Sequence, residues 1–163
     1  MALVVEDGSG KTDAESYIDL EFADTYHTDR GNSAWAEASD SEREQALRKA
    51  ADYIDSAYRF VGFRKSADQS LAWPRQSAVD PAGRAIDVVP SAVKQAQAVA
   101  ALILLSRDLY AVAERGGRVK RVQVGPVTQE FSDSASDYTD PQEVTALLHE
   151  IVRGRGSVKV ERS

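Results

Sequence analysis

A glycine-rich segment near the N-terminus holds residue types that could bind phosphate. Gly8–Thr12 ends in Gly-Lys-Thr, as does the P-loop, in which backbone N–H groups and a lysine hold phosphates. The full motif requires a glycine five residues before Gly10, where this chain has Val5, and it opens directly into a helix. Asp13–Tyr17 is a poor helix start. We therefore interpret Asp7–Glu15 as a flexible surface loop.

Side chains that could act as nucleophiles, general bases or metal ligands are sparse. The chain has no cysteine, which excludes disulfides, thiolate chemistry and cysteine-ligated zinc. Its two histidines, His27 and His149, lie far apart, and we expect His27 to be a surface or boundary residue rather than a base or ligand. The motifs of nucleophile elbows, zinc proteases, EF-hands and dinucleotide sites are absent. We expect a protein that is not an enzyme and that uses no cofactor or metal.

Residues 60–86 form the most basic region of the chain and are interrupted by glycine and proline. Pro74 favours an extended backbone at Trp73. Two interpretations of Trp73 stay open. It closes one end of the core, which we favour slightly, or it anchors a partner together with Arg75, since Trp and Arg are enriched in interface hot spots. The candidate patch for single-stranded nucleic acid, which needs cations and stacking aromatics, is Arg59, Phe60, Phe63, Arg64, Lys65, Trp73 and Arg75.

The composition is that of a globular protein with one core. The chain has 163 residues, of which 42% are hydrophobic and 28% charged, and a net charge of −6. The negative charge argues against a broad nucleic-acid-binding surface but allows a local basic patch. The N-terminus lacks the features of a signal peptide, and no segment is long enough to span a membrane. We expect assembly in a cytoplasm and no membrane partner.

The segment Pro90–Glu114 organises the predicted fold. Pro90 and the cap residue Ser91 can begin a helix, and Ala98–Leu105 is apolar throughout. A helix that is apolar on all sides and too short for a membrane span is the central helix of a packed domain. At about 1.5 Å per residue it would be roughly 36 Å long. We predict a mainly α fold, a small helical bundle around this one long helix.

Three further helices are predicted from their start and stop signals. Phe22, Ala23 and Tyr26 should share the inner face of the first, because they are three to four residues apart. We expect a single domain over residues 1–163 with an N-terminal arm at 1–18, a helical core at 19–115, a β-hairpin at 118–132, a C-terminal helix at 140–153 and a tail at 155–163. The predicted helices are Leu20–Arg30 with cap Asp19, Asp40 to about Arg59 with a Ser39/Glu42 capping box, and a helix beginning at Asp140-Pro141 and ending before Gly154; Asn32–Ser39 is a linker carrying Trp35.

The predicted hairpin turns at Gly125-Pro126. Val122 and Val124 lie on one face, and Val127 and Phe131 can oppose them. A two-stranded ribbon alone is marginal in water, so it should lean on the bundle or be completed by another chain. The first strand is basic at Arg118, Lys120 and Arg121.

The order and spacing of several short stretches between about residues 7 and 152 carry a family resemblance. These stretches are Asp13–Ile18, Ala23–His27 with Arg30-Gly31-Asn32 and Trp35, Ala50–Asp55, Leu71–Arg75, Val89-Pro90 and Val124–Val127. Together they resemble the small head–tail connector (adaptor or head-completion) proteins of tailed bacteriophages, in particular the group labelled "DnaT-like single-stranded DNA-binding".

The resemblance implies a structural virion protein. Such adaptors form a homo-oligomeric ring, of about twelve subunits, beneath the portal protein in the neck of the particle, and they present a surface to stopper or tail-completion proteins. DNA would pass through the ring without specific binding. The implied contact residues for subunits or partners are Trp73, Arg75, Arg118, Lys120, Arg121, Val124, Gly125, Pro126 and Val127.

The group label suggests an alternative function, a replication-type protein that binds single-stranded DNA. Such a protein needs a basic groove with aromatic side chains on which bases stack. The net charge of −6 and the aromatic content of 7% favour the connector instead.

Overall fold

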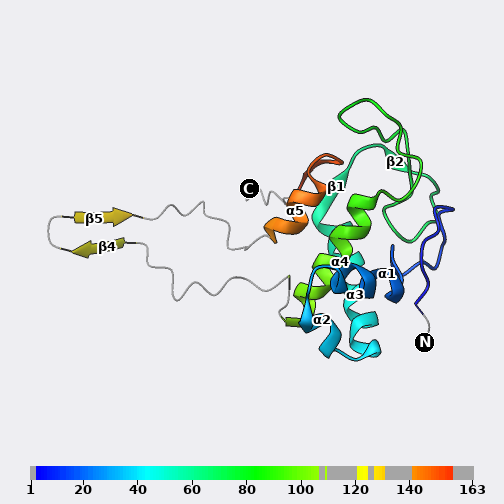
Figure 1. Ribbon diagram of the computed structural model, residues 1–163. Helices are drawn as coiled ribbons and strands as arrows, with labels where there is room; N and C mark the ends of the chain where they lie inside the picture. Colours follow the sequence, from blue (N-terminus) through cyan, green and yellow to red (C-terminus); the bar gives the residue numbers. More distant parts are fainter. Residues whose placement is uncertain (1–2, 107–108, 110–120, 125–126, 131–140, 156–163) are drawn as a thin grey trace.

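The protein is mainly α-helical, as predicted, and one helix contacts all the others that the structure describes. The computed structural model describes residues 3–106, 109, 121–124, 127–130 and 141–155. The central helix α4 (Ser91–Ser106) contacts α1 (Leu20–Thr28), α2 (Ser33–Glu37), α3 (Asp40–Ala57) and α5 (Gln142–Leu148). Figure 1 shows these helices gathered around α4, which confirms its predicted role as the hub of the bundle.

Small side chains on α4 allow the close approach of its neighbours. Ala96, Ala98, Ala100 and Ala101 are fully buried. The apolar run was predicted to have no wet face, but this is wrong for its C-terminal half, because Val99 and residues 102–105 are only partly buried. The described helix ends at Ser106, and the remainder of the predicted helix, apart from buried Leu109, lies outside the described residues.

Helix α1 begins where its cap residue predicts. The Asp19 carboxylate accepts from the Phe22 N–H at 2.8 Å. The buried face is formed by Ala23 and His27, four residues apart, and this corrects two predictions. Phe22 is 37% exposed rather than inward-facing, and His27 is a core residue rather than a surface one.

The predicted linker before α3 contains the short helix α2, whose Trp35 belongs to the core. The Trp35 Nε1–H donates to Asp24 at 2.6 Å, and the indole lies against the His27 ring with 4.6 Å between centroids. These contacts order a segment whose composition alone suggests a loop.

Helix α3 starts with the predicted Ser39/Glu42 capping box and ends in β1 (Tyr58–Phe60). Its buried stripe includes Leu47, Ala50, Ala51 and Ile54, which recur at helical spacing. Ala57 is only partly buried, because the chain leaves the helix there and becomes a strand.

Three antiparallel strand pairs accompany the helices: β1 with β6 (Val152–Arg155), β2 (Phe63–Arg64) with β3 (Arg75–Gln76), and β4 (Arg121–Val124) with β5 (Val127–Glu130). The pairing with β1 explains why the C-terminal helix is shorter than predicted. Instead of continuing to residue 153, the chain turns after α5 and Val152 pairs with Phe60. The predicted cap Asp140 lies outside the described residues.

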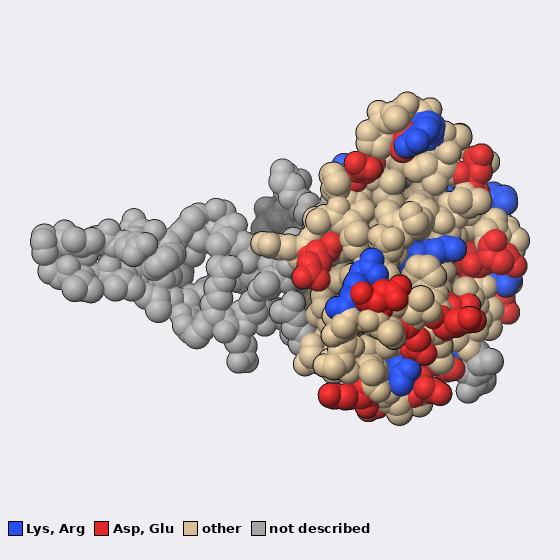
Figure 2. Space-filling model, in the orientation of Figure 1, with Lys and Arg blue, Asp and Glu red and all other residues tan. Residues whose placement is uncertain are grey.

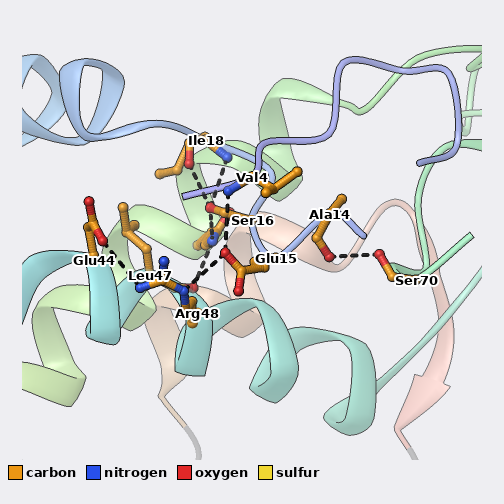
Figure 3. A network of polar contacts seen from close by, with 10 residues as sticks. Val4, Ala14, Glu15, Ser16, Ile18, Glu44, Leu47, Arg48 and Ser70 are labelled. Atoms are coloured by element: carbon orange, nitrogen blue, oxygen red, sulfur yellow. Dashed lines mark hydrogen bonds and ion pairs between the residues drawn. The ribbon is translucent and has the colours of Figure 1, made fainter. Parts of the chain in front are cut away.

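The N-terminal arm is fastened to the hub by a buried polar network (Figure 3). Val5 and Ser16 form an isolated parallel bridge within the arm. The Gln97 amide of α4 donates to the Ser16 hydroxyl at 2.7 Å and to the Leu47 carbonyl at 2.8 Å, and its oxygen accepts from the Tyr17 N–H at 2.9 Å. Figure 3 labels Ser16 and Leu47 within this network. One side chain therefore joins the arm, α3 and α4.

Candidate interaction surfaces

The glycine-rich loop has the N–H geometry of an anion site, but its own carboxylate occupies it. The N–H groups of Gly8 and Gly10 donate to Glu6 Oε1 at 2.8 and 2.9 Å, and that of Lys11 donates to Oε2 at 2.8 Å. Glu6 is buried, and the Lys11 ammonium donates to the Val5 carbonyl. The segment is a loop, as predicted, and these hydrogen bonds give it a defined conformation. The rejection of a phosphate site agrees with this geometry.

Trp73 lies inside the protein, so the interpretation that it closes one end of the core is confirmed. It is 0% exposed and meets Phe60 edge to face with 5.7 Å between ring centroids. The backbone N–H of Trp73 donates to the Tyr17 hydroxyl at 3.3 Å. In this fold neither Trp73 nor Phe60 offers a ring to a partner or a base.

Arg75 is used mainly to hold the backbone around β1 and β3. Its guanidinium donates to the carbonyls of Val61, Gly62 and Ala72 at 2.6, 2.8 and 3.1 Å. Burial, together with the positive charge of the nearby Arg64, lowers the pKa of Arg75 from its ordinary value. Arg75 therefore contributes charge to this end of the molecule while its donors serve the fold.

The remaining residues of the predicted nucleic-acid patch are on the surface around β1 and β2. Phe63 is 63% exposed, and Arg59, Arg64 and Lys65 are exposed beside it in sequence. Arg64 pairs with Arg75 across β2 and β3. Arg153, on the strand paired with β1, is also exposed and adds a cation that sequence reasoning did not include. We name this set of Arg59, Phe63, Arg64, Lys65 and Arg153 the basic end.

The predicted hairpin forms. Val124 pairs with Val127, and Arg121 pairs with Glu130, in the register that a two-residue turn requires. Arg118, Lys120, Gly125, Pro126 and Phe131 lie outside the described residues. Figure 1 shows β4 and β5 away from the helices.

Other classes of site are not found in the part of the chain that the structure describes. No group of three or more His, Asp or Glu side chains there could hold a metal ion. Among the same residues, no helix combines the length and the apolar character that crossing a membrane requires.

The described residues form a helical bundle with a separate hairpin and a basic end that carries an exposed aromatic side chain. The model of the family described as "Putative DnaT-like ssDNA binding protein" matches residues 1–163, so the chain belongs to this family. No curated protein and no solved structure matches the chain.

Proposed function

We propose that the protein is a head–tail connector subunit of a tailed bacteriophage particle, located in the neck and contacting the portal on one side and a stopper or tail-completion protein on the other. The observation that carries the proposal is the β4–β5 hairpin, whose strands pair with each other and lie away from the helical bundle in Figure 1.

An isolated two-stranded ribbon is marginal in water and gains stability from a surface to pack on. A neighbouring subunit supplies such a surface in an oligomer. Contacts between two different patches on neighbouring copies are head to tail, and they close into a ring when the rotation between copies divides a full turn. A ring of about twelve subunits around a DNA channel is consistent with this arrangement.

The charge of the surface suits a channel through which DNA slides. The net charge is −6, and Figure 2 shows acidic side chains spread over the displayed face of the bundle with fewer Lys and Arg side chains among them. Fixed phosphate contacts to lysine and arginine hold DNA tightly, so a ring that lets DNA pass should offer few of them.

Quantitative mass spectrometry of purified particles tests the proposal. A connector should be present at roughly a dozen copies per particle, as a closed ring supplies. A protein that is abundant in the lysate and absent from particles would contradict the connector function.

The second candidate function is binding of single-stranded DNA, which the family description names. The structural observation in its favour is Phe63, a 63% exposed aromatic among the cations of the basic end. Base–aromatic stacking contributes about 1–3 kcal/mol per base, so Phe63→Ala should weaken oligonucleotide binding roughly five-fold or more.

Fluorescence anisotropy at several salt concentrations separates the two candidates. Phe22→Ala is a matched control, because Phe22 is also exposed but lies in α1 next to Glu21. Salt-dependent binding that only Phe63→Ala weakens supports the second function. Equal effects of the two substitutions, or no measurable binding by the wild type, contradict it.

A further inference from the structure

Three hollows on the surface of the bundle adjoin one another in a strip, because neighbouring hollows share lining residues. The first, of about 500 Å³, lies between α1, α4 and α5, and it shares Tyr26 and Arg30 with a hollow of about 450 Å³ along α1. It shares Asn32 and Leu102 with a third, of about 570 Å³, which runs past α2 to the end of α4. We name this strip the α4 groove.

The floor of the α4 groove is apolar. Val99, Leu102, Ile103 and Leu105 of α4 line it, and each is only partly buried by the described residues. Leu147 of α5 adds to the same floor. These are the residues for which the sequence predicts full burial, so the apolar half of the hub has surface left to cover.

Aromatic side chains extend the groove along α1. Phe22 and Tyr26 stack with 6.4 Å between ring centroids, and the Arg30 guanidinium lies 3.6 Å from the centre of the Tyr26 ring. Phenylalanine, tyrosine and arginine that stay accessible side by side are typical of protein–protein contact surfaces. The guanidinium is already engaged, since it also donates to the Tyr26 carbonyl at 3.1 Å.

The rim of the α4 groove is acidic. Among its lining residues Arg30 is the one cation, whereas Glu21, Asp29, Glu37 and Glu143 are exposed carboxylates. An occupant that fits this surface is apolar along its centre and basic beside it. A nucleic acid does not fit, because its phosphates would face these carboxylates.

We propose that the α4 groove of one copy receives the β4–β5 hairpin of a second copy. The hairpin has the required chemistry, because β4 combines Val122 and Val124 with Arg121, and Lys120 precedes it in the sequence. Its separation from the helices in Figure 1 leaves it able to reach a neighbour. This inference rests on the proposed function, and it names the contact that would link successive subunits of the ring.

Cysteine cross-linking tests the contact without interference, because the natural chain has no cysteine. One variant, Val122→Cys, carries the thiol in the hairpin, and a second, affinity-tagged variant, Ile103→Cys, carries it in the groove. Under mild oxidation the mixture should give several-fold more tagged heterodimer than a mixture of Val122→Cys with Asp68→Cys. Asp68 is an exposed loop residue that does not line the groove.

Three outcomes would overturn the proposal. Equal yields in the two mixtures would mean that the groove does not receive the hairpin. A linked monomer from the Val122→Cys/Ile103→Cys double variant, without heterodimer from the mixture, would show that each groove holds its own hairpin. Preferential linkage of Ile103→Cys to Val158→Cys would assign the groove to the C-terminal tail.

Charge reversal distinguishes a specific contact from disulfides that form by random collision. Lys120→Glu with Arg121→Glu in the hairpin variant should reduce the heterodimer yield several-fold, and Glu37→Lys with Glu143→Lys in the groove variant should restore it. A yield that these changes leave unaltered would overturn the proposal. The two experiments test different claims. A protein that is present in particles but gives no heterodimer would keep the proposed connector function and lack only this contact.

Discussion

Asp55 is a partly buried carboxyl group that joins α3 to the loop before β3. It accepts from the Tyr17 hydroxyl at 2.5 Å and from the Ala72 N–H at 2.7 Å. Burial raises its pKa from 3.8 to about 6, although both hydrogen bonds act in the opposite direction. The desolvation of the carboxylate therefore outweighs the hydrogen bonds that it receives.

This raised pKa predicts a pH dependence of stability. Between about pH 4 and pH 6 the folded state keeps the Asp55 proton that the unfolded state loses, so the contribution of Asp55 is full below about pH 4 and is lost as the pH rises through 6. The loss should be about 1–3 kcal/mol. Urea unfolding of wild type and Asp55→Asn should be measured at pH 4, 5, 6 and 7. The unfolding free energy of the variant should rise relative to that of the wild type as the pH increases. A constant difference would contradict the shifted pKa.

His27 shows what sequence reasoning misses at the residue scale. A single histidine on a short helix reads as a boundary residue, yet its ring is buried, with Nε2 3.1 Å from the Ala98 carbonyl and Nδ1 3.0 Å from the Asn32 amide. Burial lowers its pKa from 6.5. The partners come from distant or non-helical segments, so nothing in the local pattern indicates them.

At the scale of elements, periodicity and caps predicted most helix starts, and the errors occur where tertiary contacts decide. Asp19 and the Ser39/Glu42 box mark the starts of α1 and α3 correctly. The end of α5 was missed because strand pairing with β1 outweighs the local helical pattern. The assembled basic end could be predicted only in part, since Arg153 joins it through that same pairing.

Gln97 predicts how firmly the N-terminal arm is attached. Gln97→Leu would fill the space but leave the Tyr17 N–H and the Leu47 carbonyl without this buried partner. We expect a loss of about 2–4 kcal/mol in unfolding free energy, since each buried polar group left unpaired costs about 1–3 kcal/mol. Relative to the wild type, the variant should show a larger increase in amide hydrogen exchange in residues 3–18 than in α3.

Gln97→Glu serves as the comparison for that experiment. It keeps an acceptor for Tyr17 but loses the donor to Leu47 and buries a charge, so it should be no more stable than Gln97→Leu. Wild-type stability and unchanged exchange in both variants would mean that the network does not hold the arm.

The hairpin predicts a separation of folding from assembly. Deleting Val124–Val127 should leave the helical bundle folded, because α4 packs against the other four helices without it. The thermal midpoint and helical circular dichroism should stay close to wild type, while cross-linking between copies and incorporation into particles are lost. If the bundle unfolds instead, the hairpin belongs to its core.

At the scale of the whole molecule, charge decides between a channel that DNA traverses and a surface that holds DNA. Arg75 and the four cations of the basic end lie around β1 and β2. The chain as a whole nevertheless has a net charge of −6. A local cluster can hold a few nucleotides of single strand, but a duplex would also meet the acidic side chains that Figure 2 shows over the displayed face of the bundle.

We therefore predict that the assembled protein does not hold duplex DNA. Non-specific binders with a broad basic surface have Kd values of about 10⁻⁴ to 10⁻⁶ M at physiological salt, and this protein should bind more weakly. Anisotropy of a labelled duplex, measured with cross-linked assemblies at physiological and lower salt, checks this. Asp68→Lys with Asp87→Lys, at exposed positions that do not line the α4 groove, makes the surface more basic and should strengthen binding, so it confirms that the assay can detect an interaction. Salt-dependent binding by the wild type with a Kd of about 10⁻⁴ M or lower at physiological salt would contradict the sliding channel, and it would favour a protein that binds nucleic acid tightly.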